Sequence, residues 1–207
     1  MRVVAGEFKG RPLMAVPGRA TRPTSDRVRE ALFSVLGERV EGAWVLDLFA
    51  GTGALAIEAL SRGARGAVLV EQAAGAAAVI RANLGALGLE GVATVRRTRA
   101  ETYLRGPALR DGPFDLVFLD PPYALGVGVV AGVLGRLADR VLRDGAVVVV
   151  EGGARGEAPP WPVGMEAERV RRYGDTALHL ATFQATLGLE SPSDLSVESP
   201  PEGGRQL

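Results

Sequence analysis

Hydrophobic and polar positions along this chain follow two alternating periods. Short runs rich in valine and leucine predict strands buried on both faces, and longer segments with an apolar residue every three or four positions predict helices. The pattern therefore predicts an α/β fold, doubly wound around a mostly parallel seven-stranded sheet that includes an antiparallel C-terminal hairpin. The predicted parallel strands are 44–49, 67–70, 92–96, 115–119 and 146–150, and the predicted helices are 54–60, 73–87, a short one from 101, and 127–142.

The C-terminal part of the chain has a different pattern. Residues 166–173 and 177–184 alternate in hydrophobicity and are joined through Gly174 and Asp175, which predicts an antiparallel hairpin on the sheet edge. From residue 188 onward the chain is rich in Ser, Pro, Glu and Gly, a composition typical of a disordered tail.

The N-terminal part precedes the alternating region. Residues 2–10 predict a short strand and turn, and residues 11–23, with three prolines, predict a loop. A capping residue among 24–26 then begins a helix that Gly37 ends. We expect three divisions: an N-terminal extension (1–40), the main domain (41–187) and an acidic tail (188–207).

The segment 44–60, WVLDLFAGTGALAIEAL, carries the first candidate binding site. Asp47 lies near the end of the predicted strand, and Gly51 and Gly53 allow a tight turn that a ligand can approach closely. Glu71 closes the next strand, where an acidic residue would hold a ribose. The glycine pattern alone is also compatible with an ordinary turn, but the two acids favour a nucleotide-type site. The ligand would be a dinucleotide or another adenosine-containing cofactor such as S-adenosylmethionine.

The sequence Asp120-Pro121-Pro122-Tyr123 directly follows the predicted strand 115–119. The prolines stiffen the loop and offer carbonyl oxygens but no N–H donors. Asp120 and the Pro121 carbonyl can accept both hydrogens of an exocyclic amino group while Tyr123 stacks on the base. Acceptors alone leave the nitrogen lone pair aimed at an electrophile, as methyl transfer requires. A turn with a buried tyrosine is the alternative for the isolated motif, but its place after a strand of this sheet favours a site for a planar amine.

Composition excludes several kinds of chemistry. The 207 residues include no cysteine and a single histidine, His179, which lies in an alternating strand pattern. Thiolate sites, histidine metal sites and Ser-His-Asp triads are therefore not expected, and we expect no bound metal. No run of 18 apolar residues occurs, so we expect a soluble, cytoplasmic protein without a membrane segment.

The net charge of zero conceals an asymmetry along the chain. Residues 1–40 contain eight basic and four acidic residues, and Arg22, Arg27 and Arg29 cluster around the predicted helix start. A helix N-terminus with three arginines favours phosphate binding. Ordinary solvent-exposed charges are an equally good interpretation of the spacing alone.

Together, these motifs resemble the class I S-adenosylmethionine-dependent methyltransferases, which have a Rossmann-like fold. Within them the chain is similar to the RsmD family, the guanine-N2 methyltransferases of small-subunit (16S) ribosomal RNA. The resemblance covers residues 1 to about 185, and the N-terminal signature is its specific part. The matching segments are VVAGEFKGRPL, RPTSDRVREALFSVL, DLFAGTGALAIEALSRGA, VLVEQ, DPPY and RRYGDTAL.

The resemblance implies roles for individual residues. Asp47, Gly51 and Gly53 would line the methionine part of S-adenosylmethionine, and Glu71 would hold its ribose. Asp120, Pro121 and Tyr123 would hold the target base, and the arginines would contact ribosomal RNA or the assembling small subunit. Where the family usually has an acidic residue near adenine, this chain has RRTRA (96–100), so we expect adenine to meet backbone at Ala100 or the side chain of Glu101. We expect the protein to act as a monomer.

Other functions stay open on the sequence alone. D-P-P-Y does not distinguish guanine from an adenine N6 amino group in DNA or RNA, or from a protein amide. A nicotinamide-dependent oxidoreductase is supported only by the glycine turn and Glu71, and the scarcity of lysine and histidine argues against it. A non-catalytic RNA-binding module would not need Asp120 and Tyr123.

Overall fold

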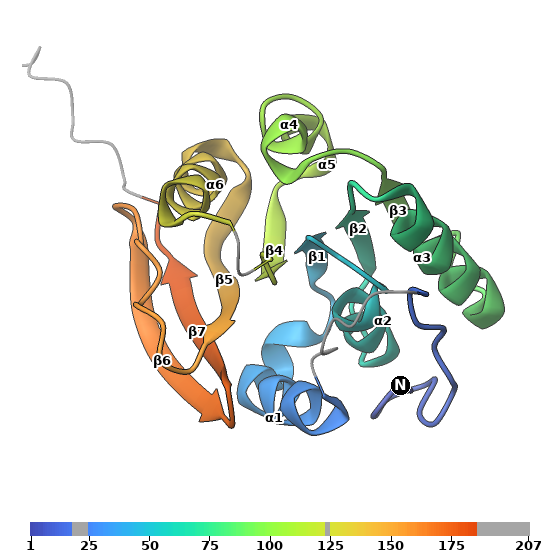
Figure 1. The fold of residues 1–207 in the computed structure, drawn as a ribbon. Helices are drawn as coiled ribbons and strands as arrows, with labels where there is room; N and C mark the ends of the chain where they lie inside the picture. Colours follow the sequence, from blue (N-terminus) through green and yellow to red (C-terminus); the bar gives the residue numbers. More distant parts are fainter. Residues whose placement is uncertain (18–24, 123–124, 186–207) are drawn as a thin grey trace, which may run out of the picture.

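The computed structural model describes residues 1–17, 25–122 and 125–185. Seven strands form one sheet in the order β3-β2-β1-β4-β5-β7-β6 (Figure 1). The first five strands are parallel, and β7 pairs antiparallel with both β5 and β6. The predicted mixed sheet with a C-terminal hairpin at its edge is thus confirmed. The strands are β1 (Trp44–Leu48), β2 (Gly66–Val70), β3 (Ala93–Arg96), β4 (Phe114–Leu119), β5 (Leu142–Gly153), β6 (Met165–Tyr173) and β7 (Thr176–Phe183).

Helices cover both faces of this sheet. Each α-helix lies close to its predicted position, except that the short helix after β3 is divided in two, and the 3-10 helix after Leu36 was not predicted. Ser25 caps α1 by accepting a hydrogen bond from the Val28 N–H, as expected for a serine before a helix. The helices are α1 (Asp26–Leu36), the 3-10 helix η1 (Gly37–Val40), α2 (Ala54–Ser61), α3 (Ala74–Leu87), α4 (Ala100–Leu104), α5 (Ala108–Asp111) and α6 (Val127–Arg140).

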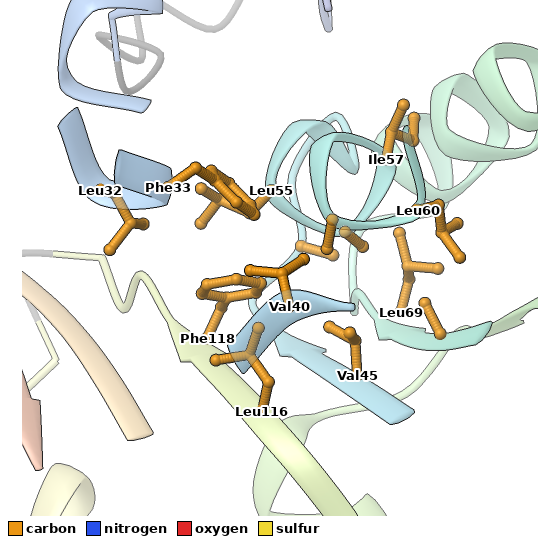
Figure 2. Packing of buried hydrophobic residues seen from close by; sticks show 14 of the residues in the cluster. Leu32, Phe33, Val40, Val45, Leu55, Ile57, Leu60, Leu69, Leu116 and Phe118 are labelled. Atoms are coloured by element: carbon orange, nitrogen blue, oxygen red, sulfur yellow. The ribbon is translucent and has the colours of Figure 1, made fainter. Parts of the chain in front are cut away.

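The alternation of side chains along each strand divides the core into two layers. In β4, Phe118 packs with α1, α2 and α3 on one face, and its neighbour Val117 packs with α4, α5 and α6 on the other. Figure 2 shows Phe33 of α1 next to Phe118, with their ring centroids 5.8 Å apart. Both faces are buried along β1, β2 and β4, which explains why these strands are almost continuous runs of apolar residues.

In the N-terminal segment (residues 1–17), the turn predicted within 2–10 forms at residues 7–10, but the predicted short strand does not form. Within the described residues, its ladder contact is a single bridge between Arg2 and Pro12. The N–H groups of Val4 and Ala5 instead donate to the carboxylate of Glu58 on α2, at 2.8 and 3.0 Å. The prediction was wrong because a buried side chain, which sequence periodicity does not reveal, supplies the acceptors that a strand partner would have given.

Candidate active site

The acidic residues of the two sequence motifs meet at the edge of the sheet that is formed by the carboxyl ends of the parallel strands. Strand β1 pairs with β2 on one side and β4 on the other, and Leu48 is in register with Val70 and Leu119. Glu71 and Asp120 each follow directly after those partners, and Asp47 directly precedes Leu48. The strand order continues from β1 to β2 and β3 on one side and to β4 and β5 on the other. The carboxyl end of β1 is therefore the topological switch point, which is where open α/β sheets bind ligands.

The glycine turn (residues 49–53) joins β1 to α2 at this edge. Phe49 has a φ of 64°, a rare conformation for a residue with a side chain. Gly53 has a φ of 79°, and an added Cβ would lie 3.0 Å from Leu69 Cδ2, so glycine is strongly favoured there. At Gly51, with a φ of 58°, an added Cβ would meet only the Phe49 carbonyl oxygen at 3.9 Å. The backbone at Gly51 is therefore open to a ligand.

Three buried polar side chains lie at the glycine turn; two of them, Glu71 and Asn83, hydrogen-bond to it, and Asp47 hydrogen-bonds to the first turn of α2. Asp47 Oδ2 accepts from the Ala56 N–H at 3.2 Å, and Glu71 Oε2 accepts from the Gly51 N–H at 3.0 Å. Glu71 also accepts from the Ala73 N–H at 2.7 Å, which orients its carboxylate toward the turn. The third is Asn83 of α3, whose Nδ2 donates to the Thr52 carbonyl at 3.0 Å. Asn83 was not predicted from the sequence, although a polar residue on the core-facing side of a helix was a signal for it.

The acidic cluster changes the protonation of Asp47. The pKa of Asp47 is raised to about 8, mainly by burial and in part by the negative charges of Asp120 and Glu71, while the hydrogen bond from Ala56 opposes the shift. A cationic ligand beside these carboxylates would relieve both effects. The carboxyl groups at this edge therefore fit a positively charged ligand group.

Pro121 and Pro122, which follow Asp120 in the chain, form one wall of a cavity of about 280 Å³. Its other walls come from the start of α6, the end of β5 and the loop 157–160, and they are largely apolar. His179 of β7 also lines it, and burial, aided by the charge of Arg172, lowers the pKa of His179. The predicted position of His179 within a strand is confirmed, and its place in a cavity wall was not predicted. Tyr123 lies outside the described residues.

The candidate cofactor residue Ala100 begins α4, close after the carboxyl end of β3, and is buried. Arg96, within the segment that departs from the family pattern, is ion-paired with Asp111 at 2.8 Å. Glu101 follows Ala100 and is half-buried. A role for Ala100 or Glu101 toward adenine stays a prediction.

The predicted arginine cluster is not a single surface. Arg27 is exposed, but Arg29 is fully buried and is paired with Glu58 at 3.5 Å and Asp26 at 2.9 Å. Its guanidinium also donates to the Arg2 carbonyl. The prediction that Arg29 contacts RNA is therefore wrong, because the fold brings the carboxylate of Glu58 on α2 against Arg29. Arg22 lies outside the described residues.

Membrane-spanning and metal-binding features are both absent from the described residues. No helix there has the length and apolar character needed to cross a membrane. Over the same ranges, no three His, Cys, Asp or Glu side chains are grouped as metal ligands would be.

The sequence of this chain is similar to those of known proteins. A family model described as "Conserved hypothetical protein 95" matches residues 1–182. The Ribosomal RNA small subunit methyltransferase D of Escherichia coli K12 is 35% identical over 195 residues, 94% of each chain. A candidate rRNA methyltransferase of Bacillus subtilis, YlbH, is 46% identical over 123 residues, 59% of this chain and 67% of its own.

Solved structures are similar over most of their length. The Escherichia coli protein yhhF, a candidate methyltransferase, superposes with a TM-score of 0.79 at 35% identity, covering 89% of this chain and 98% of its own. A hypothetical protein of Thermus thermophilus superposes with a TM-score of 0.74 at 30% identity, covering 87% and 98%. The class I methyltransferase fold that the sequence predicted is confirmed, and the chain belongs to the RsmD family.

Proposed function

We propose that this protein transfers a methyl group from S-adenosylmethionine to the exocyclic N2 amino group of a guanine in small-subunit ribosomal RNA. The observation that carries the proposal is the convergence of the glycine turn, three carboxylates and the Pro121-Pro122 segment at one edge of the sheet. The name of the Escherichia coli relative supports ribosomal RNA as the substrate. The substrate is the naked RNA or the assembling small subunit, and the enzyme acts in the cytoplasm as a monomer.

The residues at this edge suit S-adenosylmethionine. The open backbone face at Gly51 suits its methionine part, and the carboxylate of Asp47 suits its positively charged ammonium group. Glu71 keeps acceptor capacity for ribose hydroxyls, because a carboxylate has about four lone pairs and two are used by backbone N–H groups. When bound, the cofactor supplies an already activated methyl group.

The protein's task is then to align the guanine amine. Asp120 and the Pro121 carbonyl would accept the two N2 hydrogens, and Tyr123 would stack on the base. The nitrogen lone pair that these acceptors leave free would take up the methyl group of the cofactor, and the amine would then release one proton to water. Because a methylated aromatic amine loses this proton readily, Asp120 orients the amine and need not be a strong base. Turning a base out of the RNA costs about a few kcal/mol, which phosphate contacts can offset.

Methylation of unmodified small-subunit ribosomal RNA, followed by nucleoside analysis, tests the proposal. Asp120→Ala should slow the chemical step about tenfold or more while cofactor affinity is retained, because its acceptor acts on the amine. Asp139→Ala, at an exposed position on α6, is the matched control and should be unaffected. N2-methylguanosine should be the product. The appearance of N6-methyladenosine instead would overturn the assignment of the base.

A further inference from the structure

The N-terminal segment is hydrogen-bonded to side chains of α2 and α3, the two helices that pack next to the glycine turn. Glu58 accepts from Val4 and Ala5, and Ser61 Oγ accepts from the Phe8 N–H at 3.0 Å and donates to the Ala5 carbonyl at 2.6 Å. These two anchors, Glu58 and Ser61, both belong to α2. Their hydrogen bonds to the N-terminal segment do not involve the glycine turn. Asn83 is a third anchor, and it differs from both.

Asn83 links the N-terminal segment directly to the glycine turn. Its amide is 2% exposed, and its Oδ1 accepts from the Met14 N–H at 2.8 Å. Its Nδ2 donates to both the Met14 carbonyl at 3.2 Å and the Thr52 carbonyl at 3.0 Å. Both amide hydrogens are thus used, one on each side of the link.

The Thr52–Gly53 peptide is held at both ends. Its carbonyl accepts from Asn83, and its N–H, which belongs to Gly53, donates to the Ala50 carbonyl at 2.7 Å. A peptide held at both ends cannot rotate without breaking a hydrogen bond, so the turn keeps its left-handed conformation before a ligand arrives. Replacing the amide by a carboxylate would bring an acceptor against two carbonyls and favour rotation.

We propose that Asn83 is a positioning residue that uses one amide group to lock the Thr52–Gly53 peptide of the cofactor-binding turn against Met14 of the N-terminal segment. This inference rests on the proposed use of S-adenosylmethionine. Asn83 does not touch the reacting atoms. It keeps the turn ready for the cofactor, so its loss affects cofactor affinity more than the methyl transfer that follows binding.

Calorimetric titration with S-adenosylmethionine, combined with methylation rates at saturating cofactor, tests this role. Asn83→Asp should weaken cofactor binding about tenfold, because the hydrogen bond to the Thr52 carbonyl of the turn becomes a repulsion, while the rate at saturation stays within about threefold of wild type. Asn83→Ala removes both donors without adding a carboxylate, and it should act in the same direction if the aspartate variant does not fold.

Ser61→Ala is the matched control. Ser61 is as deeply buried as Asn83 and holds the same segment, but it does not contact the glycine turn. It should lower thermal stability and leave cofactor affinity within about twofold. Equal losses of affinity in the Ser61 and Asn83 variants, or unchanged affinity in both Asn83 variants, would overturn the inference. A wild-type protein that does not bind S-adenosylmethionine would overturn the proposed function and this inference together.

Discussion

At the scale of single residues, Asp47 connects stability to pH. Its folded-state pKa of about 8 lies above the ordinary value of 3.8, so the folded protein binds a proton that the unfolded chain has released between these two pH values. The stabilisation linked to this proton is complete below about pH 4 and is lost as pH rises toward 8. Ligand-free protein should therefore become less stable over this range, by at most about 1.4 kcal/mol per pH unit from this group.

Urea unfolding at intervals from pH 5 to 8 measures this effect, with Asp47→Asn as the comparison. The asparagine cannot titrate, so the difference in unfolding free energy between the two proteins isolates Asp47 from every other group, His179 included. We expect the variant to gain stability relative to wild type as pH rises. Parallel pH profiles for the two proteins would show that Asp47 is already ionised near pH 5.

At the scale of elements, the start of α2 depends on a backbone conformation that only glycine supplies easily. Gly53→Ala should destabilise the protein by about 1–2 kcal/mol for the left-handed conformation alone, and the close contact with Leu69 adds to this. Gly75→Ala, in the first turn of α3, meets nothing within 4 Å and should be neutral or stabilising by about 0.5–1 kcal/mol. Chemical denaturation compares them, and equal effects would mean that the turn before α2 relaxes to accept alanine.

At the scale of the whole molecule, Arg27 and Arg29 should behave in opposite ways. Arg29 joins the N-terminal segment, α1 and α2, and removing one partner of a buried ion pair typically costs about 3–5 kcal/mol. Arg27 is exposed, and it lines a cavity at the start of α1 together with Arg2 and Lys9. Arg27→Ala should leave stability almost unchanged and weaken binding to ribosomal RNA. In a plot of log affinity against log salt concentration, the magnitude of the slope should fall by somewhat under about 1.

Filter binding at several salt concentrations and chemical denaturation separate these effects. Arg29→Ala should lose stability, whereas Arg27→Ala should lose RNA affinity. An unchanged salt slope for Arg27→Ala would mean that Arg27 is an exposed side chain that does not contact RNA phosphates. An Arg29→Ala protein as stable as wild type would show that Glu58 and Asp26 are satisfied without it.

The sequence by itself determined the order and type of nearly all elements, and with them the sheet edge where the candidate site lies. Buried parallel strands need apolar side chains on both faces, so the runs at Val45 and Val117 could not be mistaken for surface segments. Asp47, Glu71 and Asp120 could be identified because each is a carboxylate at or near the end of such a run. These features are local along the chain, and local patterns are what a sequence displays directly.

The tertiary structure alone decided which polar residues turn inward and what they hold. Arg29 looked like part of a basic surface until α2 brought Glu58 opposite it, and the N-terminal strand failed because the same carboxylate took its N–H groups. Asn83 gains its meaning only where Met14 and Thr52, 38 residues apart in the chain, meet at one amide. The physical reason is common to these cases: a buried polar group must find partners, and those partners come from segments whose proximity no local pattern records.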